Sequence, residues 1–193
     1  ETYKEINFNN IETKISKNKL CCTLSHLKTI FQAYLDGKQE ILVLEDDMNI
    51  TYFNQWKLKI KDILNKKPIN AECIIFYCNN EKEVASMIKE KDLFSEWKLE
   101  KNRWATGAYY INRLGMKKLY DLFYKNNSYH IKQIQCEALA DHLLYYYLNT
   151  YNYTKPLFNN KLYKSEISIK KNKTQIINKH DVETEKVIKT FFK

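Results

Sequence analysis

The chain has 193 residues, 44% of them hydrophobic, and a net charge of +9, which is enough material for one domain with an ordinary core. Its 3 glycines and 2 prolines exclude collagen-like, elastic or linker-dominated architecture, and no apolar run approaches the roughly 18 residues of a membrane span. We therefore expect a single domain over 1–193, with a core at about 20–167 and a basic extension at 168–193.

The positive charge comes almost entirely from lysine, because Arg103 and Arg113 are the only arginines. Base reading in DNA grooves relies on the planar arginine side chain, so lysine alone indicates non-specific phosphate binding at best. Nucleic acid is therefore not the partner we expect, whereas a basic surface also suits an anionic substrate such as a nucleotide diphosphate. The 5 cysteines are odd in number and lack paired C-x-x-C spacing, which predicts reduced thiols rather than a zinc site.

Helical and extended patterns alternate through the first half of the chain. Over 20–35 the apolar residues recur at spacings of three and four, which predicts a helix that ends at the turn 36–38. The aliphatic run 40–44 predicts a buried, parallel strand, and 73–78 predicts a second buried strand. Between them the pattern of 54–66 predicts a helix. Its inward residues are expected to be Trp56, Ile60, Ile63 and Leu64.

The second half continues this alternation. Residues 79–103 are charged and lack clear periodicity, so we expect an irregular insertion or mobile flap with at most a short helix. The run 106–112 predicts a third strand, and helices are predicted at 114–124, 134–147 and 182–192. Strands that alternate with helices indicate the α/β class. The residues expected to face inward in the first two of these helices are Leu114, Leu119, Leu122, Phe123, Leu139, Leu143, Leu144 and Tyr147.

Three consecutive carboxylates, Glu45, Asp46 and Asp47, follow the first predicted strand. Carboxylates side by side at the end of a buried strand repel one another unless a cation or hydrogen-bond donors neutralise them, and this end of a strand is where open α/β sheets bind ligands. Alternate residues of an extended segment point the same way, so Glu45 and Asp47 are expected to face one site and Asp46 another. Their oxygen atoms suit Mg²⁺ or Mn²⁺. The alternative is a solvated acidic turn that caps the next helix.

The segment 22–26, Cys-Thr-Leu-Ser-His, stands at the start of the first predicted helix. A helix N-terminus with small hydroxyl groups favours anions, and His26 would add a donor toward a phosphate or a sugar hydroxyl. In the alternative interpretation, Thr23 and Ser25 only cap the helix and His26 is satisfied within the core.

Two further features are candidate parts of a site. Gly107 is one of 3 glycines, which indicates a place where a side chain would obstruct the backbone or a ligand. The alternative there is a β-bulge. Glu137 and Asp141 stand four apart on one predicted helix face with His142 beside them, and a carboxylate there would serve as a general base. The alternative is a pair of ordinary carboxylates on a helix surface.

In this order, the motifs resemble glycosyltransferase family 25, the group of lipopolysaccharide β-galactosyltransferases and collagen galactosyltransferases. The family shares a Gly-Cys-x-x-Ser-His segment, a strand ending in Leu-Glu-Asp-Asp, a Thr-x-Ala-Tyr-x-Ile stretch, a later helical Asp and often Ser-Asp-Ile. The resemblance covers about 20–167. The corresponding positions are 22–26 followed by Leu27, 44–47, 106–111 followed by Leu114-Gly115, Asp141, and Ser165-Glu166-Ile167.

The resemblance implies a GT-A fold, with a mixed central sheet flanked by helices, that transfers galactose or glucose from a UDP-sugar with inversion at the anomeric carbon. It implies that Asp47 binds Mn²⁺ or Mg²⁺, with Glu45 and Asp46 sharing the metal, the ribose or the sugar, and that the metal neutralises the leaving diphosphate. Asp141 is then the expected base, with Glu137 in reserve. The acceptor is expected to be a glycan, a lipid-linked saccharide or a protein hydroxyl. The remaining expected donor-binding residues are Ser25, His26, Thr106 and Gly107.

The chain departs from the family pattern at two places. Cys21 stands where the family has Gly, and the usual first strand with its arginine-rich turn is not found before Leu20, where only the segment 5–8 is similar. The chain opens at Glu1 rather than Met and shows no signal peptide, so we expect a trimmed or shortened member whose own N-terminus, with any targeting signal, was removed. The compartment that we expect is the cytoplasm. The alternatives to catalysis are a GT-A-like binding or scaffold domain that has lost turnover, and a lysine-rich nucleic-acid-binding protein.

Overall fold

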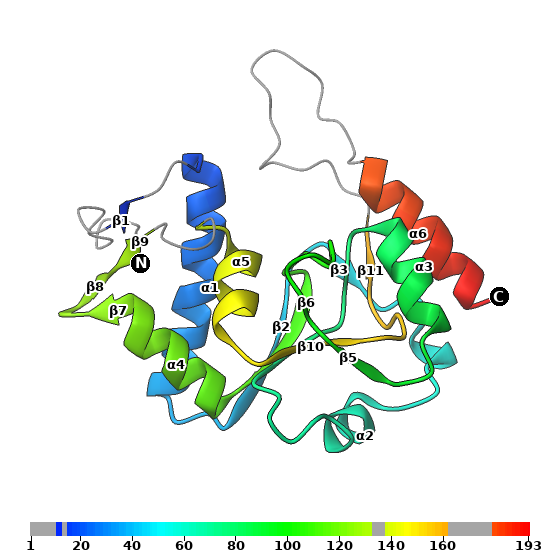
Figure 1. The fold of residues 1–193 in the computed structure, drawn as a ribbon, viewed down its shortest axis with the longest axis horizontal. Helices are drawn as coiled ribbons and strands as arrows, with labels where there is room; N and C mark the ends of the chain where they lie inside the picture. The colour runs from blue at the N-terminus through cyan, green and yellow to red at the C-terminus, as the bar shows by residue number, and fades with distance from the viewer. Residues whose placement is uncertain (1–10, 13–14, 133–137, 162–178) are drawn as a thin grey trace, which may run out of the picture.

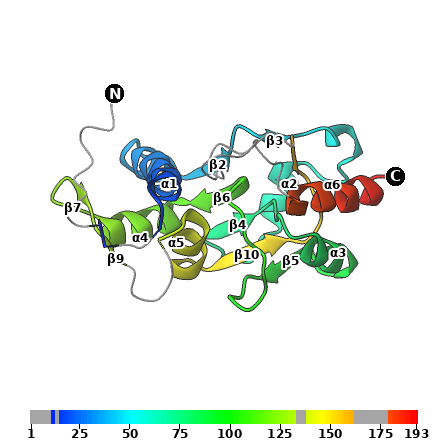
Figure 2. The same ribbon diagram turned by 90° about the horizontal axis from the view of Figure 1, so that it is seen from above.

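The computed structural model describes residues 11–12, 15–132, 138–161 and 179–193. Helices lie on both faces of a central mixed sheet, in three layers (Figures 1 and 2). The expected α/β class, a mixed sheet flanked by helices, is therefore confirmed. The helices on one face are α1 (Lys17–Leu35), α4 (Arg113–Phe123) and α5 (Ala140–Tyr147). Those on the other face are α2 (Ile60–Asn65), α3 (Glu81–Lys89) and α6 (Lys179–Phe191).

The central sheet has 5 strands in the order β2-β6-β4-β10-β5. Their bounds are β2 (Glu40–Leu44), β6 (Ala108–Asn112), β4 (Cys73–Ile75), β10 (Thr150–Tyr153) and β5 (Phe94–Glu96). β4 and β10 are parallel, and the other neighbours are antiparallel. The strands β2, β4 and β10 consequently run in one direction, so their C-terminal ends lie at the same sheet edge as the start of β6.

The two helical layers pack on separate hydrophobic cores because successive strand side chains point to opposite faces. On β4, Cys73 and Ile75 join the core under α1, α4 and α5, whereas Ile74 joins the core under the other helices. β6 divides in the same way between Tyr109 and Tyr110. All of these side chains are buried, so the middle of the sheet is a rigid support for the loops at its edge.

The first predicted helix is confirmed but starts earlier than expected. Its periodic apolar face, which includes Leu24, Leu27 and Ile30, is buried in α1. The helix begins at Lys17 and stops before Gly37, whose φ of 76° suits glycine. The segment 22–26 therefore lies inside the helix, and the expectation that it forms the helix N-terminus is wrong.

The expectation that β2 is a buried, parallel strand is also wrong. In the described part of the chain β2 lies at the edge of the sheet, antiparallel to β6. Ile41 and Val43 pack against the first core, while Leu42 and Leu44 are 40% and 46% exposed. An aliphatic run specifies an extended segment, but not how many neighbours that segment will have.

Three predicted helices differ from the structure. The segment expected at 54–66 is a 3-10 turn (Phe53–Gln55) followed by α2, because the chain is extended at Trp56, and among its expected inward residues Ile63 is fully buried. In α4 the buried face includes Met116, whereas Leu114 and Leu122 are exposed. α5 begins at Ala140, after an extended residue, rather than at 134, and residues 133–137 lie outside the described part.

Residues 79–103 contain a short helix, as the sequence allowed, and a strand that was not predicted. They contain α3, which packs on α6, and β5, which pairs with β10. Arg103, at the end of the segment, is 1% exposed and binds Glu83 and Glu90. Arg103 therefore pairs with two carboxylates of the same segment, a contact that a search for apolar periodicity does not reveal.

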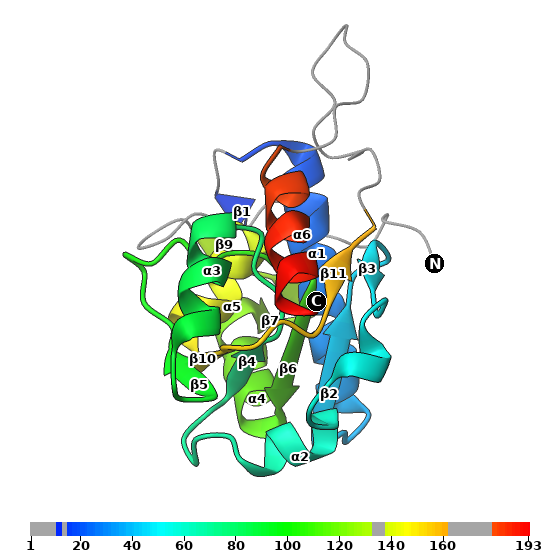
Figure 3. The same ribbon diagram turned by 90° about the vertical axis from the view of Figure 1, so that its right-hand side faces the viewer.

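β10 and several short strands were not predicted. Beside β10 there are three pairs, β1 (Ile11–Glu12) with β9 (Ile131–Lys132), β3 (Met48–Asn49) with β11 (Asn159–Asn160), and β7 (Tyr124–Lys125) with β8 (Ser128–Tyr129). The predicted terminal helix is confirmed as α6, and Figure 3 shows it in front of the sheet with β11 and β3 beside it. The segments 5–8 and 165–167 lie outside the described residues.

Candidate active site

A cleft of about 330 Å³ opens at the sheet edge where β2 and β4 end and β6 begins. Four carboxylates line it, from Glu45, Asp47, Asp141 and Asp181, together with Lys19 as the one cation among its described lining residues. The whole chain has a net charge of +9, but the side chains that line this cleft have an excess of negative charge. The cleft therefore attracts cations rather than free anions.

The structure brings together most, but not all, of the predicted site residues. Those that line the cleft are Glu45, Asp47, Thr106, Gly107 and Asp141. Ser25 is exposed, and its hydroxyl donates to the backbone oxygen of Cys21 (2.9 Å) within α1. Glu137 lies outside the described residues.

Glu45 is held by a chain of hydrogen bonds at the end of β2. Thr106 Oγ1 donates to Glu45 Oε1 (2.5 Å), and His26 Nε2 lies 3.1 Å from the same oxygen. His26 Nδ1 lies 3.0 Å from the hydroxyl of Tyr109 on β6. A neutral imidazole satisfies both contacts, because Nε2–H donates to the carboxylate and Nδ1 accepts from the hydroxyl. His26 is buried and orients Glu45. This position is close to the alternative interpretation, in which His26 is satisfied within the core.

The environment of Glu45 favours the ionised carboxylate. Burial alone would raise the pKa of Glu45, but the hydrogen bonds from His26 and Thr106 outweigh it and leave the pKa below its usual value. Glu45 is therefore a fixed negative charge in the cleft at neutral pH.

Asp47 faces the same cleft with one free carboxylate oxygen. Asn160 Nδ2 donates to Asp47 Oδ2 (3.1 Å), whereas the buried Oδ1 has no hydrogen-bond partner among the described residues. Burial, followed by the charges of Glu45 and Asp46, raises the pKa of Asp47. A buried carboxylate oxygen without a partner is costly, and a cation would relieve both the missing contact and the repulsion.

Asp46 points elsewhere, as the alternation predicted. It is exposed and does not line the cleft, while its backbone oxygen accepts from Lys161 Nζ (3.0 Å). The chain turns here, because the backbone N–H of Met48 donates to the oxygen of Glu45 (3.1 Å). Glu45 and Asp47 thus share one side of a tight turn rather than one side of an extended strand.

Asp141 enters the cleft from the first turn of α5. Its Oδ1 accepts from the backbone N–H of His142 (3.0 Å), and the imidazole of His142 stacks on Trp104 with ring centroids 4.4 Å apart. Burial raises the pKa of Asp141, and the charge of Glu45 acts in the same direction. A buried carboxyl with a raised pKa beside a cleft is the arrangement that suits a general base.

Asp181 is a cleft residue that sequence reasoning missed. It lies in the first turn of α6, far from the motifs in sequence. Burial raises the pKa of Asp181, and the charge of Asp47 raises it further. An acid in a first helical turn is common for local reasons, so the sequence contains no signal that places this one over the cleft.

Cys22 lies beside His26 and Glu45, with one potential ligand atom of each within 4.8 Å of the others. Burial and the charge of Glu45 raise the pKa of the Cys22 thiol to about 11, so it is protonated at neutral pH. Both ring nitrogens of His26 are already bonded. The oxygen atoms near Asp47 are therefore the better metal ligands in the cleft.

Gly107 provides close packing at the floor of the cleft. A Cβ atom there would lie 2.7 Å from Met48 Sδ and 3.0 Å from Tyr77 Cδ1. The backbone oxygen of Gly107 accepts from the N–H of Glu45 (2.8 Å), which joins β6 to the acidic turn. A side chain at position 107 would therefore clash, as expected, and it would clash with the side chains of Met48 and Tyr77, which line the cleft.

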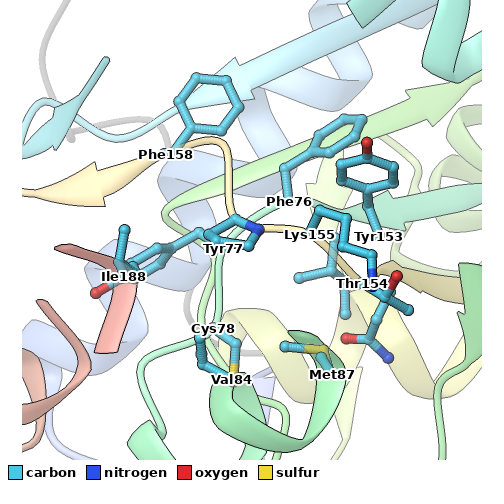
Figure 4. Close-up of a pocket in the computed structure, with 13 residues that line it drawn as sticks. Phe76, Tyr77, Cys78, Val84, Met87, Tyr153, Thr154, Lys155, Phe158 and Ile188 are labelled. Carbon is cyan, nitrogen blue, oxygen red and sulfur yellow. The ribbon is translucent and has the colours of Figure 1, made fainter. Parts of the chain in front are cut away.

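A second cavity lies between β4, β10 and α3 and is shown in Figure 4. Its volume is about 20 Å³, and its labelled lining includes Phe76, Met87 and Tyr153. This space holds about one water molecule and is too small for a sugar or a nucleotide. The acidic cleft is therefore the candidate active site.

Comparison with known proteins assigns the chain to a class. The model of glycosyltransferase family 25, described as LPS biosynthesis protein, matches residues 1–138. This is well over half of the chain, which therefore belongs to glycosyltransferase family 25. The match includes Glu45, Asp47 and Thr106, and it ends before Asp141 and Asp181. No curated protein and no solved structure matched the chain. None of the helices in the described residues is both long and apolar enough to cross a membrane.

Replacement of Asp47 by Asn should stabilise the protein in the absence of divalent cations. Because the pKa of Asp47 is raised in the folded state, its ionisation lowers the free energy of unfolding as the pH rises through that value. In EDTA at pH 7, Asp47→Asn should therefore melt at a higher temperature than the wild type, and the difference should shrink as the pH falls toward 4.

The exposed neighbour provides the control for this measurement. Asp46→Asn makes the same change of charge on an exposed residue outside the cleft. It should raise the melting temperature much less than Asp47→Asn, because burial and Glu45 contribute more than Asp46 to the raised pKa of Asp47. A melting temperature of Asp47→Asn at or below that of the wild type at pH 7 would contradict an electrostatically strained cleft.

Proposed function

We propose that this protein is a metal-dependent glycosyltransferase that moves galactose or glucose from a UDP-sugar to a hydroxyl group of a glycan, a lipid-linked saccharide or a protein, with inversion at the anomeric carbon. The observation that carries the proposal is the meeting of Glu45, Asp47 and Asp141 in one cleft, at the sheet edge of a family 25 chain. Open α/β sheets bind ligands at this edge.

The charge of the cleft supports a requirement for a divalent cation. A nucleotide diphosphate is repelled by four carboxylates, and Lys19 alone does not balance them. Asp47 suits Mn²⁺ or Mg²⁺, since its buried Oδ1 has no partner in the described chain and Glu45 lies nearby as a second oxygen donor. Bound there, the ion would supply electrostatic stabilisation to the departing diphosphate.

The residues around the acidic turn hold these carboxylates in place. Thr106 and His26 fix Glu45 through its Oε1, and Asn160 fixes Asp47 through its Oδ2. The remaining oxygen atoms are thereby directed to the cleft before any ligand binds. Such preorganisation reduces the entropy that is lost when a ligand is bound.

Asp141 is the proposed catalytic base. It lies on α5, in the helical layer on one face of the sheet, whereas α6 lies on the other face (Figure 2). In the ionised form its carboxylate accepts the proton of the acceptor hydroxyl as the new bond to the anomeric carbon forms and the bond to the diphosphate breaks. Inversion requires this base to act from the side opposite the leaving group.

The donor site is tested by calorimetric titration of UDP into the protein with Mn²⁺ and again with EDTA. We expect binding only with the metal, and loss of this binding in Asp47→Asn while Asp46→Asn retains it. Binding of UDP by Asp47→Asn with unchanged dependence on Mn²⁺ would overturn the assignment of Asp47.

A further inference from the structure

The C-terminal helix contributes an acidic residue to a cleft whose other walls come from earlier in the chain. Asp181 of α6 lines the same cleft as Glu45 and Asp47, although it lies beyond the segment that matches the family. α6 packs along α3 and is shown from outside in Figure 3. Asp181 is therefore placed where it could contact a ligand bound in the cleft.

Hydrogen bonds tie α6 to the acidic turn. Glu185, one helical turn after Asp181, accepts from the backbone N–H of Asn160 (2.7 Å) and from Asn159 Nδ2 (3.2 Å). These two asparagines form β11, which pairs with β3 directly after Asp47. Asn160 Nδ2 also donates to Asp47 Oδ2 (3.1 Å). The position of Asp181 relative to Asp47 is therefore fixed through a short series of bonds.

Two residues that line the cleft, Asp47 and Tyr77, have a buried polar atom without a partner among the described residues. Tyr77 lines the cleft and is 5% exposed, yet its hydroxyl has no hydrogen-bond partner among the described residues. Figure 4 shows the Tyr77 ring reaching toward α6, beside Ile188. Asp47 Oδ1 is buried without a partner as well. Buried polar groups are nearly always satisfied, so these atoms indicate a polar ligand at this place.

A hydrated divalent cation would satisfy this set of groups. Mg²⁺ and Mn²⁺ take carboxylate oxygens and usually keep several water molecules. The carboxylates would be bound directly or through such water, and the Tyr77 hydroxyl would bond to the water. An anion would instead be repelled by Asp47 and Asp181.

We propose that Asp181 is a ligand, directly or through a bound water molecule, of the divalent cation held at Asp47. The inference rests on the proposed function and extends it: the cation site is built from the acidic turn after β2 and from the first turn of α6. A chain that ends before α6 would then retain the family motifs but bind the metal weakly.

The test measures Mn²⁺ binding to the full chain without UDP, by electron paramagnetic resonance of the free ion. Asp181→Asn should weaken Mn²⁺ binding by at least about tenfold. The matched control is Glu183→Gln, which makes the same change of charge on the same helix, where Glu183 pairs with Lys186 (2.9 Å) on the exposed side. This control should bind Mn²⁺ like the wild type.

Thermal melting gives a second readout that does not depend on activity. Mn²⁺ should raise the melting temperature of the wild type and of Glu183→Gln, and should raise that of Asp181→Asn less, because at a given Mn²⁺ concentration a weaker-binding variant is stabilised less. Asp181→Glu retains the carboxylate and should recover part of the effect, which separates a ligand from a residue that only supports the fold.

The outcomes separate this inference from the proposed function. If Asp181→Asn binds Mn²⁺ as tightly as the wild type while Asp47→Asn does not, Asp181 is not a ligand and the donor site at Asp47 stands. If the wild type binds no Mn²⁺ with or without UDP, the metal-dependent function itself is overturned.

Discussion

Asp141→Asn should lower the rate of sugar transfer by about 10²- to 10⁴-fold while UDP and Mn²⁺ bind as before. The amide has nearly the same shape as the carboxylate, and its oxygen still accepts from the backbone N–H of His142. It cannot take a proton from an acceptor hydroxyl. The measurement is turnover of UDP-galactose and UDP-glucose, with UDP affinity determined by calorimetry on the same samples.

The pH dependence of the wild type provides a second readout of the same role. Burial raises the pKa of Asp141, and a base must be ionised to act. Turnover should therefore fall as the pH decreases through a value above the usual range of aspartate, and this limb should be absent from the residual activity of Asp141→Asn.

A matched substitution on the protein surface controls for loss of charge. Asp121 lies exposed on α4 and pairs with Lys117, so Asp121→Asn should leave turnover unchanged. Transfer at the wild-type rate by Asp141→Asn would exclude Asp141 as the base. UDP binding by the wild type without any transfer, at high enzyme concentration, would instead favour a binding or scaffold domain.

Local patterns predicted the elements that make up the floor of the cleft. Short apolar runs located β2, β4 and β6, and a spacing of three and four located α1. β10 was missed because its sequence, Thr-Tyr-Asn-Tyr, contains no aliphatic residue. Its strand conformation comes from pairing with β4 and β5 on its two sides, which a single segment does not encode.

The inward faces of some helices were predicted wrongly because hydrophobicity alone does not specify how a helix packs. In α4 the side that meets the sheet carries Gly115, where a Cβ atom would lie 3.1 Å from the backbone oxygen of Glu72. This close approach places Met116 in the core and turns Leu114 outward. The spacing of leucines identifies an amphipathic helix, but the close contact between Gly115 and the backbone of Glu72 decides which side of the helix faces the sheet.

The candidate site divides in the same way between local and distant residues. Glu45 and Asp47 were predictable because they are two positions apart in sequence, directly after a strand. Asp181 and Asn160 arrive through the pairing of β3 with β11 and the packing of α6, which leave no mark in a short segment. The role of His26 changed because α1 begins at Lys17, which places the imidazole against Glu45 rather than at a free helix end.

Arg103→Met should lower the free energy of unfolding by about 3–5 kcal/mol. The buried guanidinium donates from Nε to Glu83 (2.9 Å), from Nη2 to Glu90 (2.7 Å) and from Nη1 to Ser95 (2.6 Å). The substitution keeps the apolar volume but leaves two carboxylates without their partner. For a chain of this size the melting temperature should fall by roughly 6–20 °C, measured by circular dichroism.

The second arginine provides a control for this change. Arg113 donates to the backbone oxygens of Tyr34 and Lys38 (both 3.1 Å) and stacks on the Tyr34 ring without a carboxylate partner among the described residues, so Arg113→Met should cost much less. A fall in melting temperature no larger for Arg103→Met than for Arg113→Met would contradict the assigned role.

Removal of the two carboxylates should reverse most of the loss. In Arg103→Met combined with Glu83→Gln and Glu90→Gln, the unpaired charges are gone, and the stability should recover toward the wild type if they cause the cost. The result bears on the cleft as well, because Arg103 is followed closely by Thr106, whose hydroxyl holds Glu45. Loss of the Arg103 contacts should therefore weaken UDP binding in the presence of Mn²⁺, even under conditions where Arg103→Met remains folded. The triple variant should restore UDP binding.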